Sequence, residues 1–166
     1  MSSYKVAFIS LGCAKNLVNT EQMMDLARAA GHTVTAEPDG ADVAVLNTCG
    51  FIDSAKSEAI DNILELSQLK EEGRLGKLLV AGCLTQRYKD ELLEELPEVD
   101  GILGTGSYTD IVPAIASVME GDQPTFFGDI HHTIEDGGRM LTTPPYTAYL
   151  KIAEGCDNRC SYCIIP

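Results

Sequence analysis

Short apolar runs alternate with amphipathic stretches over residues 1–120 of the chain. Lys5 to Ser10, Asp42 to Asn47 and Lys77 to Ala81 are nearly continuous apolar runs of the kind that buried strands have. Thr33 to Thr35 and Gly101 to Leu103 are shorter segments with strand character. The pattern therefore predicts about five strands.

Helical patterns fill the intervals between these runs. Asn19 and Gln22 have the spacing of a capping box, so we expect the first helix to begin there. In the second helix we expect Ile60, Ile63 and Leu64 to face the core. The expected starts of the other helices are Asp53 or Ser54, Thr85 and about Thr109. This alternation predicts an α/β fold, a doubly wound open parallel sheet with helices on both faces.

The pattern changes at Gly121. Glycine and proline punctuate residues 121–146, where only Thr125 to Ile130 looks extended, so we expect a linker after a first domain of residues 1–120. Ala148 to Ala153 then has the character of a strand that begins a second domain. We expect residues 147–166 to be the truncated start of that domain.

Composition and charge narrow the function classes. Of 166 residues, 45% are hydrophobic and 22% are charged, which is typical of a soluble globular protein. A net charge of −13 argues against direct nucleic-acid binding by this segment and agrees with a basic partner. Met1 to Lys5 does not begin a signal peptide, and no run is long enough to span a membrane. We therefore expect a cytoplasmic protein with no membrane partner, and free or metal-bound cysteines.

Three cysteines, Cys13, Cys49 and Cys83, each lie just beyond the end of an expected strand. Because the carboxyl ends of parallel strands line one edge of a sheet, these thiols should converge. The set has no obvious histidine partner, so it suits a cubane iron-sulfur cluster with one open iron better than zinc. Any one of these cysteines alone would instead be read as a small buried side chain. Each has a glycine neighbour that permits a tight turn: Gly12, Gly50 and Gly82.

A second set, Cys156, Cys160 and Cys163, has C-x3-C-x2-C spacing in one short segment. This spacing places three sulfurs around one cluster and leaves one iron free to bind something else. A zinc knuckle with a missing ligand and a redox pair are the alternatives. Tyr162 either packs on a neighbouring strand or forms an aromatic wall beside a bound adenine, and both readings stay open.

These segments resemble a known family. GCDNRCSYCIIP is similar to the radical S-adenosylmethionine signature in its methylthiotransferase form, and SLGCAKN, NTCGFIDSAKSE and VAGCLTQRY are similar to the N-terminal domain of the same family. SLGCAKNLVNTE most resembles the bacterial branch that modifies an aspartate of a small-subunit ribosomal protein. The transfer-RNA branch usually has glutamine where this chain has Ala14.

The resemblance implies two 4Fe-4S clusters with different roles. Cys156, Cys160 and Cys163 would hold the cluster that binds S-adenosyl-L-methionine, with Tyr162 beside that cofactor, while Cys13, Cys49 and Cys83 would hold an auxiliary cluster for sulfur donation. It also implies an electron donor such as flavodoxin and a ribosomal-protein substrate. No side chain is expected to act as a catalytic acid, base or nucleophile, because cofactors carry radical chemistry.

Two other functions remain open at this point. A transfer-RNA adenosine methylthiotransferase of the same family would use the same two cysteine sets on a different substrate. A non-catalytic zinc or iron-sulfur binding module, including an electron-transfer protein, would need the thiols alone.

Overall fold

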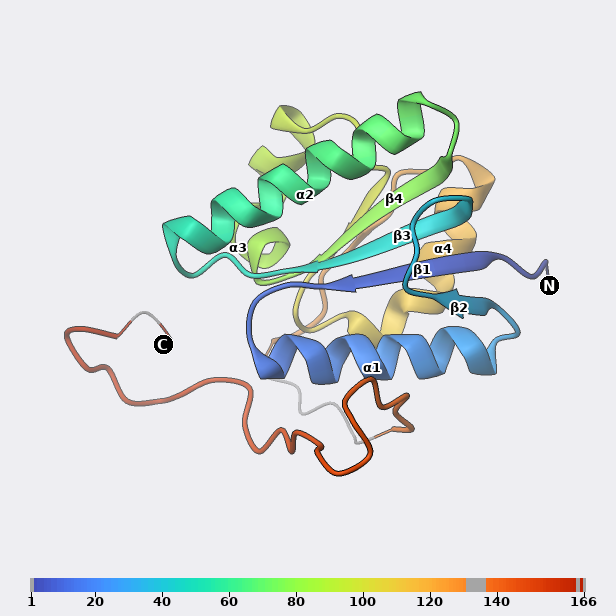
Figure 1. The fold of residues 1–166 in the computed structure, drawn as a ribbon. Coiled ribbons are helices and arrows are strands. Elements are labelled where there is room, and N and C mark those ends of the chain that lie inside the picture. Colours follow the sequence, from blue (N-terminus) through green and yellow to red (C-terminus); the bar gives the residue numbers. More distant parts are fainter. Residues whose placement is uncertain (1, 131–136, 164, 166) are drawn as a thin grey trace.

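The computed structural model describes residues 2–130, 137–163 and 165. Within these ranges the strands are all parallel and form one sheet in the order β2-β1-β3-β4-β5-β6 (Figure 1). Their bounds are β1 Lys5–Ser10, β2 Thr33–Thr35, β3 Ala41–Thr48, β4 Leu75–Gly82, β5 Gly101–Leu103 and β6 Thr125–Phe126. The α/β class and the parallel sheet are confirmed.

Helices cover both faces of this sheet, so the doubly wound arrangement is confirmed. In Figure 1, α1 lies below the sheet and α2 above it. Val43 and Val45 of β3 pack with α1 and α4, whereas Ala44 and Leu46 pack with α2 and α3. Because both faces of β3 are buried, its sequence is a continuous apolar run rather than an alternating one. The helices are α1 Ala14–Ala29, α2 Asp53–Glu71, α3 Cys83–Glu95 and α4 Ile111–Glu120, the last preceded by the 3-10 turn η1 Tyr108–Asp110.

Two helices begin earlier than the sequence pattern indicated. The first begins at Ala14 with Cys13 as its N-cap, so the capping box expected at Asn19 is wrong. Asn19 lies inside the helix, where its side chain accepts a hydrogen bond from Lys151, a partner 132 residues away. The third helix begins at Cys83, immediately after Gly82, rather than at Thr85.

The inward face of α2 also differs from the prediction. Ile63 is fully buried as expected, but Ile60 and Leu64 are 40% and 49% exposed. The helix contacts the sheet through Ala59, Ile63 and Leu66, so its buried stripe is narrower than its apolar stripe.

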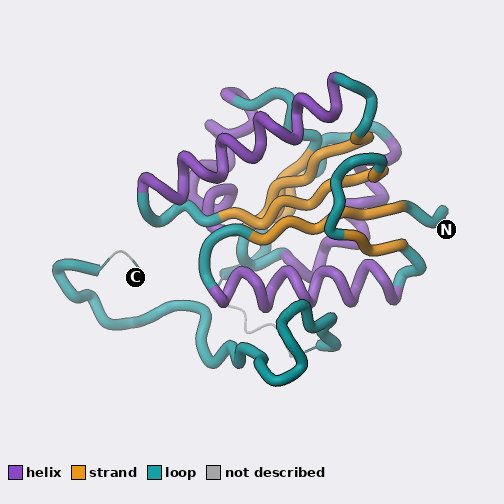
Figure 2. The backbone as a smooth tube through the Cα atoms, viewed as in Figure 1, coloured by secondary structure: helices purple, strands orange, loops and turns teal. Residues whose placement is uncertain are grey.

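The C-terminal part of the chain contains one more strand and then a long irregular segment (Figure 2). Thr125–Phe126, inside the stretch expected as a linker, pairs with β5 and extends the sheet. Residues 137–163 contain no helix or strand, so the strand expected at Ala148 to Ala153 is wrong. The described residues provide no neighbouring strand to pair with it, and Leu150 and Ile152 are more than 80% exposed. Figure 1 shows this segment passing below α1 and then extending away from the sheet.

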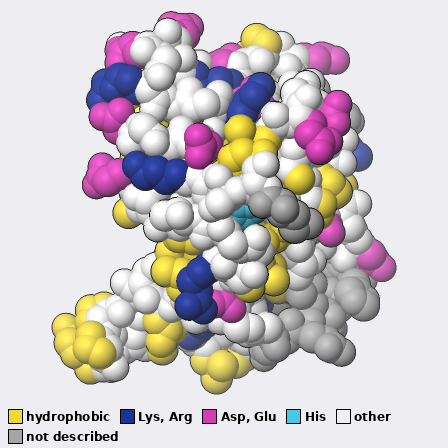
Figure 3. Space-filling view, turned by 90° about the vertical axis from the view of Figure 1, so that its right-hand side faces the viewer, with side chains coloured by type: hydrophobic (Ala, Val, Ile, Leu, Met, Phe, Trp, Pro, Cys, Tyr) yellow, Lys and Arg dark blue, Asp and Glu magenta, His cyan; other side chains and the backbone are white. Residues whose placement is uncertain are grey.

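Charged side chains of both signs are interspersed on the face that Figure 3 presents, where the amino ends of the strands lie. Asp100 is the best connected of the acidic residues there. Its carboxylate accepts hydrogen bonds from Lys70, from Lys77 at 3.0 Å and from the backbone N–H of Leu78 at 2.8 Å. Partial burial raises the pKa of Asp100, but these three donors outweigh burial and hold it below the usual value.

Replacing Asp100 should therefore destabilise the protein in a pH-dependent way. Because the folded-state pKa of Asp100 is lowered, its contribution is present above the pKa of the unfolded chain and is lost as pH falls through the lower, folded value. We expect Asp100→Asn to lower the free energy of unfolding by about 1–3 kcal/mol at neutral pH, with the difference shrinking below about pH 4. Urea denaturation at several pH values measures this, with exposed Asp61→Asn as the control. A difference that does not change with pH would contradict the account.

Candidate functional site

The parallel register brings the carboxyl ends of β1, β3 and β4 to one edge of the sheet. Ser10 of β1 is paired with Asn47 of β3, and Thr48 of β3 is paired with Gly82 of β4. The three predicted cysteines follow these paired residues by one to three positions along the chain. The strand order reverses between β1 and β3, which is where ligands bind in open parallel sheets. The first cysteine set therefore lies at the topological switch point.

Glycines allow the three cysteine-bearing loops to touch. A Cβ on Gly12 would lie 2.5 Å from Cβ of Cys49, and a Cβ on Gly50 would lie 2.9 Å from Cα of Leu84. The first contact joins the loop after β1 to the loop after β3, and the second joins the loop after β3 to the start of α3. No larger residue fits at either glycine without displacing a neighbouring loop.

Asn16, which the sequence analysis did not single out, fastens the same three loops together. Its side-chain N–H₂ group donates to the carbonyl of Leu11 at 3.2 Å and to that of Thr48 at 2.9 Å. Its side-chain oxygen lies 3.9 Å from Sγ of Cys83, from which it accepts a weak hydrogen bond. Asn16 lies on the first turn of α1, three residues after Cys13 in SLGCAKN, and this spacing could have identified it as a residue of the site.

The three cysteines differ in exposure. Cys13 is exposed, Cys49 is half-buried and Cys83 is 8% exposed. Burial raises the pKa of the Cys83 thiol to about 11, with the charge of Lys15 acting in the opposite direction and those of Cys49 and Cys13 adding to the rise. The effect of Cys13 and Cys49 on the pKa of Cys83 agrees with the three thiols lying near one another.

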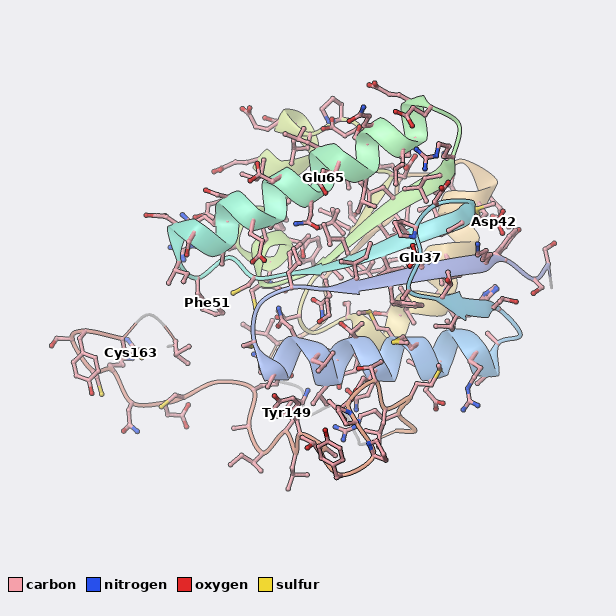
Figure 4. The ribbon with its side chains drawn as sticks, in the orientation of Figure 1. Glu37, Asp42, Phe51, Glu65, Tyr149 and Cys163 are labelled. Carbon is pink, nitrogen blue, oxygen red and sulfur yellow. The ribbon has the colours of Figure 1, made fainter. Side chains whose placement is uncertain are left out.

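Two adjoining cavities occupy that space. A cavity of about 940 Å³ is lined in part by Cys13 and Cys49, and one of about 590 Å³ is lined in part by Cys83 and Cys156. Phe51 lines both, and Figure 4 places it at the edge of the molecule where β3 ends. The edge thus offers a hollow of the size that a bound group requires.

Lys15 and Glu154 form an ion pair that lines both cavities. Lys15 Nζ lies 2.8 Å from Oε2 of Glu154 and also donates to its backbone carbonyl at 2.9 Å. Burial lowers the pKa of Lys15, but the hydrogen bond and charge of Glu154 outweigh burial and raise it. Burial likewise raises the pKa of Glu154, and the hydrogen bonds from Lys15 and Lys151 lower it to a net value below the usual one. Both groups are therefore charged at neutral pH.

The second cysteine set lies in the irregular C-terminal segment. Cys156, Cys160 and Cys163 are all exposed, and Figure 4 shows Cys163 in the part of this segment that extends away from the sheet. Tyr162 is 90% exposed, so its ring packs on none of the strands in the described residues. Of this set, Cys156 lines the same cavity as Cys83.

The donor set fits a cluster better than a single ion. Among the described residues, no three Cys, His, Asp or Glu side chains are grouped closely enough to hold one metal ion. A cubane differs from a single ion because each thiolate binds a different iron, so the sulfurs surround the group rather than meet at one point. The three cysteines lie on separate loops beside two adjoining cavities, with glycines where the loops touch, so they border a space and do not meet at one point. None of the helices in the described part of the chain is long and apolar enough to cross a membrane.

Similarity to known proteins extends over most of the chain. A family model described as "Uncharacterized protein family UPF0004" matches residues 5–104. A protein of Pelotomaculum thermopropionicum named "Ribosomal protein uS12 methylthiotransferase RimO" is 51% identical over 98% of this chain and 37% of its own length. Proteins of the same name from Desulforamulus reducens and Clostridioides difficile are 51% and 49% identical over 97% and 98% of the chain. The chain spans 37% of the length of each of these curated relatives.

Gly82 should be among the least replaceable residues of the site. It has φ +102°, and a Cβ there would lie 2.4 Å from Oδ1 of Asn47, whereas Gly31 has φ +93° with nothing within 4 Å of a Cβ. We expect Gly31→Ala to lower the free energy of unfolding by about 1–2 kcal/mol through backbone conformation alone. Gly82→Ala should lower it by roughly 3 kcal/mol or more, because steric overlap is added to backbone strain. Urea denaturation of both variants tests this, and equal losses would contradict it.

Proposed function

Because this chain belongs to the family described as Uncharacterized protein family UPF0004, we propose that it is part of an enzyme that transfers a methylthio group to ribosomal protein uS12. Cys13, Cys49 and Cys83 would supply the site of an auxiliary iron-sulfur cluster. The observation that carries this proposal is that these three cysteines, from separate strand ends, line two adjoining cavities at the switch point. The name shared by the relatives supports the reaction and the substrate.

The auxiliary site would be built by the first cysteine set. When bound there, a 4Fe-4S cluster would provide the sulfur that becomes part of the methylthio group. Gly12 and Gly50 keep the loops close enough for all three thiols to face one group. Asn16 fixes the loops relative to one another through its hydrogen bonds to Leu11 and Thr48, so the thiols are held in place before the cluster binds.

The second cysteine set would serve the radical step. Cys156, Cys160 and Cys163 would hold a second 4Fe-4S cluster, which together with S-adenosylmethionine would supply a radical that removes hydrogen from an unactivated carbon. Tyr162 would lie beside that cofactor. Because Cys156 lines the cavity that Cys83 also lines, the second set has a starting point next to the first.

The charge around the site supports a basic protein as the substrate. Ser54, Ala55 and Glu58 line the larger cavity from one flank of α2, and at helical spacing the same flank continues with Asp61 and Glu65. Both of these carboxylates are exposed, and Figure 4 shows Glu65 on the outer side of the helix. An acidic approach to the site attracts a lysine- and arginine-rich protein and repels a phosphate backbone. This disfavours a transfer-RNA substrate.

The electron donor and the cellular location are inferred only from the proposed reaction and substrate. Radical cleavage of S-adenosylmethionine requires one electron at a time, so the enzyme would need an electron donor such as flavodoxin. A ribosomal substrate would place the enzyme in the cytoplasm.

Metal analysis separates this proposal from a zinc-binding module. Reconstituted without oxygen with iron and sulfide, the 166-residue chain should bind iron at the first cysteine set. The triple variant Cys13→Ser, Cys49→Ser, Cys83→Ser should then lose about four irons and four sulfides per chain. Iron and acid-labile sulfide are measured together with the visible absorption.

The complementary triple variant of Cys156, Cys160 and Cys163 is the matched control, and it should retain the iron of the first set. Iron content that is unchanged by the first triple substitution would refute the auxiliary site. One equivalent of zinc without labile sulfide would favour the binding module instead.

A further inference from the structure

The first helix buries an unusual number of polar side chains. Asn16, Asn19, Thr20, Glu21 and Gln22 are all at most 5% exposed. A helix that packs on a sheet ordinarily buries one apolar stripe and leaves its polar side in water. In α1 the outer side is covered as well, because residues 138–155, here called the strap, lie along it (Figure 1).

Glu21 is the firmest attachment point of the strap. Glu21 is 1% exposed, and its carboxylate accepts hydrogen bonds from the backbone N–H and the hydroxyl of Thr142, at 2.7 and 2.8 Å. Its other oxygen lies 3.3 Å from Nε of Arg139, and its backbone carbonyl accepts from the N–H of Met140 at 3.0 Å. Thr142 and Arg139, which make these contacts with the carboxylate, both belong to the strap. A buried carboxylate without such partners is strongly unfavourable, so Glu21 and the strap depend on each other.

Two further contacts continue along α1 toward its N-terminus. Lys151 Nζ donates to Oδ1 of Asn19 at 2.8 Å, and Lys15 pairs with Glu154 at 2.8 Å. The helix positions 21, 19 and 15 thus meet strap positions of rising number, so the strap runs antiparallel to the helix. Cys13, the N-cap residue of α1, lies at the end of the helix that these contacts approach. Cys156 follows Glu154 by two residues. The first member of each cysteine set is therefore delivered to the same end of α1.

We propose that Glu21 and Lys15 are positioning residues that hold the strap on α1 and thereby keep the Cys156 loop at the edge where the first cysteine set lies. The importance of this placement rests on the proposed function, which requires both sets in one reaction. The attachment itself is independent of any bound cluster, because every contact that carries it is made by protein atoms.

Cross-linking between the two sets tests the placement without metal. The 166-residue chain is prepared reduced and metal-free with Cys13 and Cys156 retained and the other four cysteines changed to serine. A short bismaleimide then joins the two thiols, and mass spectrometry gives the cross-linked fraction. We expect Glu21→Gln and Lys15→Met each to lower this fraction about five-fold, the effect of losing one charged hydrogen bond. Glu71→Gln at the end of α2 makes the same chemical change as Glu21→Gln away from the strap and should have no effect.

Hydrogen exchange provides a second measurement on the chain with all its cysteines. In Glu21→Gln, the amides of Met140 and Thr142 should exchange faster, while those of β3 and β4 stay protected. A cross-linked fraction that is unchanged in both variants would overturn the proposal. So would a lower melting temperature with an unchanged cross-linked fraction, because Glu21 would then only stabilise the fold. Iron content that is unchanged by the first triple cysteine substitution would refute the proposed function and would leave these results as they are, so the two failures are distinguishable.

Discussion

The register of three parallel strands is the constraint on which the candidate site depends. Because β1, β3 and β4 pair in parallel, their carboxyl ends reach the same edge, and each is followed within three residues by a cysteine. A shift of one strand by one residue would turn its side chains to the opposite face and remove its cysteine from the hollow. Burial on both faces of the sheet prevents such shifts, so the hydrophobic core sets the geometry of the thiols.

The helix that follows β1 connects this geometry to the rest of the chain. It begins directly after Cys13, fastens the three loops through Asn16 and holds the strap through Glu21. One rigid element thus contributes to both cysteine sets. This explains why α1 carries buried polar residues that would be unfavourable in a helix packed on a sheet alone.

The sequence pattern was sufficient for the architecture and for the edge where the first cysteines gather. Apolar strands such as Asp42 to Asn47 and the position of each cysteine after a strand are local features, and the parallel sheet follows from their alternation with helices. The start of α1, the strap and the irregular conformation of Ala148 to Ala153 depend on partners far away in the chain. The residues next to Asn19 have the pattern of a helix cap. Its actual partner, Lys151, is 132 residues away, so the local pattern does not reveal it. Asn16 was missed for the same reason, since its hydrogen bonds cross between loops.

Our proposal that the first cysteine set surrounds a cluster instead of a single ion rests on the glycine contacts between the loops and on the absence of a single-ion site among the described residues. The most direct test is a crystal of the chain reconstituted without oxygen, with anomalous diffraction measured at the iron absorption edge. The account predicts a compact iron peak at the carboxyl ends of β1, β3 and β4, bonded to Cys13, Cys49 and Cys83. An iron peak bonded to none of these three cysteines, or no peak at that edge in protein that carries iron elsewhere, would contradict it.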